Sequence, residues 1–246
     1  MDISPQALRS MVEEVDEAHH DGMRDLSNQI GELHFGEGAK VMGATRRNLL
    51  RNAAMGGAAL TIGSAVLPYD RLFAGMASAA DALTDADIAG YAGGVELAAV
   101  AAYKAAISSG KVTDKAVGAA ATVFMGHHQD HANAFNKAAG DKAQKVPNKT
   151  ILAAVGGQIG KAVDQKAILE IAFSVENAAA ATYLFAIGAL KDPGALALTA
   201  SILPVEAQHA VILGTVLKKT TLELFPDKGK SFEVQTGALD PASNPA

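Results

Sequence analysis

A polar pattern that occurs twice constrains this chain more than any other feature of its sequence. A glutamate is followed seven residues later by a tyrosine at Glu96–Tyr103 and again at Glu176–Tyr183, 80 residues further on. A second pair of segments, His128–His131 and Glu206–His209, ends in histidine each time and recurs at an offset of 78. Because residues three, four and seven apart share one face of an α-helix, the pattern predicts two helical hairpins with polar groups at matching depths.

Four long helices are expected because capping residues and glycine or proline breakers divide the chain after residue 83 into alanine-rich runs. Thr84-Asp85-Ala86-Asp87 resembles a capping box at the start of the first run. Only a few residues join the helices of each hairpin, whereas more than twenty join the second helix to the third, with a short helix over 149–155. This layout predicts an all-α, antiparallel four-helix bundle over residues 81–225 with one long crossover, followed by a tail over 226–246. The predicted helices cover 84–109, 114–139, 164–190 and 195–224.

The repeated polar residues lie on apolar helical stripes, which are the faces that a bundle buries. An unpaired buried carboxylate is costly, and three close together would also repel one another. No lysine or arginine lies on these stripes near the same level to neutralise them. Divalent cations would neutralise the carboxylates. A carboxylate can bridge two ions, and an imidazole can be a further ligand to each ion. The predicted metal ligands are Glu96, His128, His131, Glu176, Glu206 and His209.

Residues 44–80 carry the ordered parts of a twin-arginine (Tat) export signal. Arg46-Arg47 precede an apolar stretch of 15 residues, Ala53–Leu67, which is too short to span a bilayer comfortably. Ala77-Ser78-Ala79 then offers a cleavage site. We expect export by the Tat machinery to the periplasm or another extracytoplasmic compartment. The alternative is an uncleaved signal that associates with the membrane through residues 53–67.

The segment that precedes the signal, residues 1–43, is unusual because it holds nine acidic residues and three basic ones. Two interpretations compete: translation starts at Met42, or the segment is an extension with an amphipathic helix around residues 8–30. His19, His20 and His34 are expected to be solvated there. The segment is left out of the fold prediction.

Together, these motifs resemble the ferritin-like di-metal carboxylate family over roughly residues 82–222, and especially the bacterial ferritin-like domain proteins with Tat signals. Members use one glutamate from each of two helices and a Glu-x-x-His motif from each of the other two, around two iron or manganese ions. The resemblance gives Glu96 and Glu176 the single-glutamate roles and makes Glu206 with His209 one Glu-x-x-His motif. His128 with His131 fills the other motif.

Position 128 departs from that family pattern, which has glutamate there. With three carboxylates and three imidazoles, one bridging ligand is missing, so oxygen activation by two irons becomes less secure. The resemblance implies two divalent ions, with iron first and manganese or zinc, or a single ion, as alternatives. His127 competes with His128, because His127 and His131 also share a face.

Several neighbours of the predicted ligands are expected to play no direct part. Tyr103 and Tyr183 are expected to be ordinary core residues, with a hydrogen bond to a ligand or a radical relay as the alternative. Asp130 and Glu170 are expected to be solvated. Pro204 is expected to bend the last helix.

The first functional hypothesis is a redox metalloprotein of the cell envelope that oxidises Fe(II) or disposes of oxygen or peroxide. The alternative is a non-catalytic, membrane-tethered helical module with a degenerate metal site; iron storage ranks below both. A net charge of −5 argues against nucleic-acid binding, and the absence of cysteine excludes thiolate sites. A homo-oligomer is compatible with the sequence.

Overall fold

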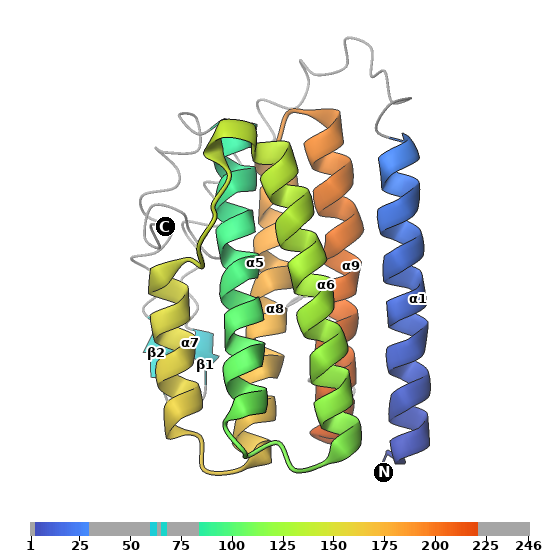
Figure 1. The fold of residues 1–246 in the computed structure, drawn as a ribbon, viewed down its shortest axis with the longest axis vertical. Coiled ribbons are helices and arrows are strands. Elements are labelled where there is room, and N and C mark those ends of the chain that lie inside the picture. The colour runs from blue at the N-terminus through green and yellow to red at the C-terminus, as the bar shows by residue number, and fades with distance from the viewer. Residues whose placement is uncertain (1–2, 30–59, 63–64, 68–83, 221–246) are drawn as a thin grey trace.

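The computed structural model describes residues 3–29, 60–62, 65–67 and 84–220, and the described part is mainly helical (Figure 1). The tail over 226–246 and nearly all of the predicted signal therefore lie outside the described residues. The helices are α1 (Pro5–Gln29), α5 (Asp85–Ser108), α6 (Lys115–Ala139), α7 (Lys149–Lys161), α8 (Gln165–Ala189) and α9 (Pro193–Val216), with a short 3₁₀ turn at Gly140–Lys142.

The helices begin where the sequence places their capping residues. Thr84 and Asp87 form the predicted capping box at the start of α5. The side chains of Asp114, Asn148, Asp164 and Asp192 each accept a hydrogen bond from the first turn of the helix that follows. Each cap satisfies backbone N–H groups that have no partner within the helix.

Two helix ends differ from the prediction. Helix α7 continues through Gly156-Gly157 to Lys161 instead of ending at residue 155. Helix α9 ends at Val216 rather than near residue 224. Lys218 has a φ of 60°, and its N–H and that of Lys219 bond back to Thr215 and Gly214. These are the closing bonds of a Schellman motif, which usually takes glycine where this chain has lysine.

Helices α5, α6, α8 and α9 stand side by side (Figure 1). Helix α5 packs closely against α6, and α8 against α9, as expected for two hairpins. Helix α7, part of the long link, packs against α5 and α8. By length and composition α8 and α9 could also cross a membrane, but half of the relevant window in each is buried within the protein, as in core helices.

Three elements, one helix and two strands, lie outside the predicted four-helix layout. Helix α1 packs against α6 and α9, so residues 5–29 of the segment that precedes the predicted signal are part of the folded protein. The strands β1 (Leu60–Ile62) and β2 (Ala65–Leu67) pair antiparallel, which is an exception to the all-α prediction. Both come from the apolar stretch assigned to the signal, where β-branched residues such as Thr61 and Val66 favour strands.

Candidate metal centre

The six predicted ligands come from four helices and meet in the interior. Helix α5 supplies one, α8 supplies one, and α6 and α9 supply two each. None has more than 1% of its surface exposed, which agrees with their positions on apolar stripes. The residues brought together are Glu96, His128, His131, Glu176, Glu206 and His209.

These residues form two overlapping groups of four that could each hold an ion. In each group the potential ligand atoms all lie within 4.8 Å of one another. One group contains Glu96 and His131, the other contains Glu176 and His209, and both contain His128 and Glu206. The arrangement therefore has two positions that share a carboxylate and an imidazole.

Glu206 joins the two positions through its separate oxygen atoms. Its Oε1 lies 2.8 Å from Nδ1 of His131, and its Oε2 lies 3.3 Å from Nδ1 of His209. Within the described part of the chain, neither oxygen of Glu206 and neither ring nitrogen of His131 has a partner in hydrogen-bonding geometry. Buried polar atoms rarely lack such partners. Atoms that lie close together without being aligned for a hydrogen bond fit a set of ligands directed at a common ion.

His128 occupies the centre of the cluster and contacts the other two carboxylates. Its Nδ1 lies 2.7 Å from Oε2 of Glu96, and its Nε2 lies 3.1 Å from Oε1 of Glu176. Both nitrogens can donate only when the ring is an imidazolium. Burial disfavours that charge, but the carboxylates of Glu206, Glu176 and Glu96 outweigh burial and hold the pKa of His128 well above its usual range.

The other ionisable groups complete the same charge balance in the metal-free protein. Burial lowers the pKa of His131, but Glu206 and Glu96 have the larger, opposite effect and raise this pKa to about 9. The pKa of His209 is likewise raised by Glu176 and Glu206 against burial. Burial raises the pKa of Glu96, yet His128 and His131 bring it down to about 2. These shifts favour protonated imidazole rings beside carboxylates when no metal is bound, so a bound metal would replace protons.

The two tyrosines of the repeat bond across the hairpins. The hydroxyl of Tyr103 on α5 donates to Glu176 on α8, and that of Tyr183 on α8 donates to Glu96 on α5. Burial and the nearby carboxylates raise both tyrosine pKa values well above the usual range, so both remain donors. The prediction of ordinary core residues was therefore wrong, and each tyrosine holds the glutamate of the opposite hairpin.

His127 and helix α1 form an outer layer beside the cluster. His127 belongs to neither group of four; its Nδ1 lies 2.9 Å from Nε2 of His209, and its Nε2 lies 2.9 Å from Oδ1 of Asp16. His19 is 2% exposed, so its predicted solvation was wrong. Its ring packs 4.1 Å from that of His127 and 5.0 Å, edge-on, from that of His131. Burial, with His127 and His131 nearby, lowers the pKa of His19 to about 3.

The remaining polar residues named from the sequence lie at the edge of the site or away from it. His20 is exposed, as expected, and His34 lies outside the described residues. The side chain of Asp130 is half exposed and lies 3.5 Å from Nε2 of His19. Glu170 forms a partly buried ion pair with Lys219, at 2.9 Å, instead of being fully solvated.

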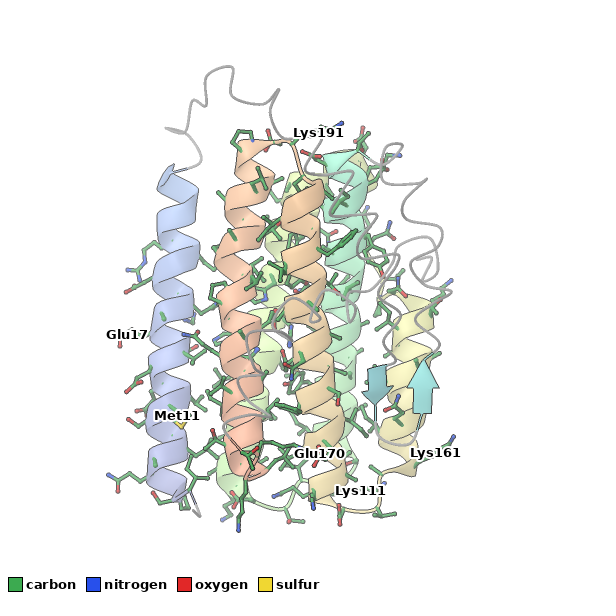
Figure 2. The ribbon with its side chains drawn as sticks, turned by 180° about the vertical axis from the view of Figure 1, so that it is seen from behind. Met11, Glu17, Lys111, Lys161, Glu170 and Lys191 are labelled. Atoms are coloured by element: carbon green, nitrogen blue, oxygen red, sulfur yellow. The ribbon has the colours of Figure 1, made fainter. Side chains whose placement is uncertain are left out.

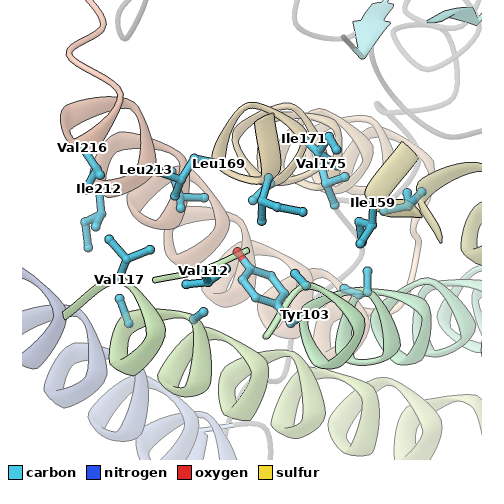
Figure 3. A pocket seen from close by; sticks show the side chains of 18 of the residues that line it. Tyr103, Val112, Val117, Ile159, Leu169, Ile171, Val175, Ile212, Leu213 and Val216 are labelled. Carbon is cyan, nitrogen blue, oxygen red and sulfur yellow. The ribbon is translucent and has the colours of Figure 1, made fainter. Parts of the chain in front are cut away.

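An apolar cavity of about 50 Å³, whose lining residues Figure 3 draws, includes Val175, the chain neighbour of Glu176, in its wall. Aliphatic side chains from α5 to α9 surround it, including Leu169, Val175 and Leu213. Among the described lining residues only Tyr103 is polar, and its hydroxyl group bonds to Glu176. A small apolar molecule in this cavity would therefore be separated from Glu176 of the cluster by Tyr103.

The fold and this site define a class: a helical protein with a carboxylate and histidine cluster at its core. Residues 84–219 match the family model for the ferritin-like domain. This match covers more than half of the chain, so the protein belongs to the ferritin-like domain family. No curated protein and no solved structure gives a significant match.

Proposed function

We propose that α5, α6, α8 and α9 form a four-helix bundle that binds two divalent metal ions, with iron first and manganese or zinc as alternatives. One ion would be held by Glu96 and His131, the other by Glu176 and His209, and Glu206 would bridge them. His128 would bind one ion through one ring nitrogen and donate a hydrogen bond to a carboxylate through the other. The observation that carries this proposal is the pair of Glu206 oxygens, which face the two positions without a hydrogen-bond partner among the described residues.

The proposed activity is oxidation of Fe(II), or disposal of oxygen or peroxide, in the cell envelope. When bound, two redox-active ions would supply the electrons that reduce an oxidant. The chain's own residues exclude water, hold the carboxylates through Tyr103 and Tyr183, and leave a small apolar space beside the site. Such a space suits dioxygen better than a charged or bulky substrate.

Export through the Tat machinery belongs to the same proposal. It is supported by Arg46-Arg47 and the apolar stretch that follows, and Tat transport suits a protein that folds around its metal before export. Membrane association through residues 53–67 would follow if the signal is retained. Assembly into a homo-oligomer is compatible with either outcome.

A second candidate function is a non-catalytic, membrane-tethered helical module. The observation that favours it is the charge balance of the metal-free cluster, where His128 bonds to both Glu96 and Glu176. A cluster that neutralises itself does not need metal to fold.

The test is the metal content of the full-length protein after anaerobic loading with Fe(II), measured by plasma mass spectrometry. His131→Ala and Glu206→Ala are compared with Glu170→Ala, which removes a carboxylate away from the cluster. Close to two irons per chain, lost in the first two variants and kept in the third, would support the di-metal centre and justify oxidase assays. About one zinc and no iron per chain would rule out the proposed redox activity. No metal in a folded protein would leave the non-catalytic module.

A further inference from the structure

A line of hydrogen bonds leads from the protein surface to one predicted ligand. It starts at Asp16 on α1, whose side chain is 42% exposed, and passes through His127 on α6, which is 2% exposed. It ends at the fully buried His209 on α9. Both links are 2.9 Å long.

The positions of the protons along this line follow from the site. Nδ1 of His209 faces Glu176 and Glu206 at 3.3 Å each, so this is the nitrogen that would bind an ion. Nε2 then carries the proton and donates it to Nδ1 of His127. The proton of His127 must therefore sit on Nε2, where it is donated to the carboxylate of Asp16. Every donor along the line has an acceptor.

We infer that Asp16 and His127 are positioning residues of the metal centre, and that α1 contributes to this centre by supplying Asp16. The inference rests on the proposed metal binding. A ligating histidine usually donates its second N–H to an outer partner, which fixes its ring orientation and tautomer and makes it a stronger ligand. Here that partner is His127, and Asp16 holds His127 in the required tautomer.

The packing of α1 shows that Asp16 is held in place rather than meeting His127 by chance. Leu8, Val12 and Val15 are buried in the core cluster shared with α6, α8 and α9. One turn after Asp16, His19 packs on the ring of His127. Glu17, the next residue along α1, points away from the protein (Figure 2).

A metal ion bound between α1 and α6 is the competing explanation. Asp16, His20 and His127 have potential ligand atoms within 4.8 Å of one another. Binding there through Nε2 of His127 would move its proton to Nδ1, where it would face the N–H of a metal-bound His209. Two donors would then meet across 2.9 Å. The occupied centre therefore opposes an ion at this second position.

The test is zinc affinity of the full-length protein, measured by competition with a chromogenic chelator. Asp16→Ala removes the acceptor that fixes the tautomer of His127 and should weaken binding, at most by the about 10- to 100-fold that usually follows loss of a ligand's outer partner, here His127. Asp16→Asn keeps an acceptor oxygen and should lose less. Glu17→Ala removes a neighbouring charge on the exposed face of α1 and should bind as the wild type does. His127→Phe keeps the ring and should resemble Asp16→Ala.

The double variant Asp16→Ala with His127→Phe separates positioning from a general loosening of α1. If Asp16 acts through His127, the double variant binds no more weakly than His127→Phe alone. Cobalt(II) bound in place of zinc should also show altered visible bands in Asp16→Ala but not in Glu17→Ala.

The outcomes that overturn the inference are distinct from failure of the proposed function. If the wild type binds neither zinc nor the Fe(II) of the loading test above, both fail together. If the wild type binds zinc and Asp16→Ala matches Glu17→Ala, only the positioning role fails. Additive losses in the double variant would also refute it, as would loss of one additional ion per chain with unchanged affinity at the remaining positions.

Discussion

Replacing His128 with glutamate should have opposite effects with and without metal. In the metal-free protein the imidazolium of His128 bonds to Glu96 and Glu176, and all three side chains are at most 1% exposed. His128→Glu removes that positive charge and adds a fourth carboxylate at the same place. Breaking a buried ion pair in this way costs about 3–5 kcal/mol.

A second route gives a similar magnitude. The new carboxyl group can avoid repulsion only by staying protonated at pH 7. With an ordinary pKa near 4.3 and about 1.36 kcal/mol per unit, this costs about 4 kcal/mol. For a domain of this size each kcal/mol lowers the melting temperature by about 2–4 °C, so the metal-free variant should melt roughly 6–20 °C lower.

Bound metal should reverse the order of the melting temperatures of the wild type and His128→Glu. Four carboxylates around two divalent ions restore the ligand set of the family that the sequence resembles, and bound metal stabilises only the folded state. Melting curves in chelator and in excess Mn(II) should therefore show a larger metal-induced rise for His128→Glu than for the wild type. His128→Gln is the control, since it removes the charge without adding a ligand. The reasoning is refuted if metal-free His128→Glu melts with the wild type, or if Mn(II) raises its melting temperature no more than that of His128→Gln.

Three further predictions address the charge balance, the tyrosines and the cavity. The pKa of His131 is raised to about 9 and that of Glu96 is lowered to about 2. The stability due to His131 is present below its usual pKa of 6.5 and is lost as the pH rises through 9; that due to Glu96 is present above 4.5 and is lost as the pH falls through 2. In chelator, the melting temperature should therefore be highest between pH 4.5 and 6.5 and fall toward pH 9, and a flat profile over that range would contradict the charge balance. Tyr103→Phe and Tyr183→Phe should each destabilise the metal-free protein by about 1.5–3 kcal/mol in urea unfolding, as expected for a lost hydrogen bond to a charged group, and equal stability would show that these bonds contribute nothing. Ala102→Val should narrow the apolar cavity and slow the reaction of the iron-loaded protein with oxygen in stopped-flow absorbance, while the iron content stays the same; an unchanged rate would exclude the cavity as the oxygen site.

The helices and the six clustered residues were predictable because local rules and burial agree there. Capping residues and breakers mark the starts of α5, α6, α8 and α9, and the repeat places its polar residues on faces that are otherwise apolar. The end of α9 was not predictable in the same way. Lys218 adopts the left-handed conformation that usually signals glycine, so the sequence offers no stop signal before Pro226.

The roles of Tyr103 and Tyr183 were harder to predict because a helical stripe shows which residues are buried but not which they meet. Each hydroxyl group bonds to a glutamate 73 or 87 residues away in the chain. The matched spacing of seven was the available signal. If both hairpins carry the pair at one depth, each tyrosine can reach the glutamate of the other hairpin.

The packing of α1 was not predicted because the segment precedes a predicted export signal and was therefore left out of the fold, although a helix around residues 8–30 was one of its two interpretations. A signal was present: Leu8, Val12, Val15 and His19 follow one another at intervals of four, three and four, which is a buried helical stripe. All four are buried in the structure. A histidine that continues an apolar stripe is better interpreted as a packed residue than as a solvated one.

The position of α1 also changes how the predicted signal should be considered. Cleavage near Ala77-Ser78-Ala79 would separate α1 from the helices against which it packs. Burying a leucine or valine side chain contributes about 1.5–3 kcal/mol, and α1 buries three of them together with His19. This burial would favour continued binding of α1 after cleavage. If Asp16 positions His127 as we infer, a form without α1 would keep its six ligands but hold His209 less firmly. If the signal is retained, α1 stays covalently attached to the metal centre that we propose.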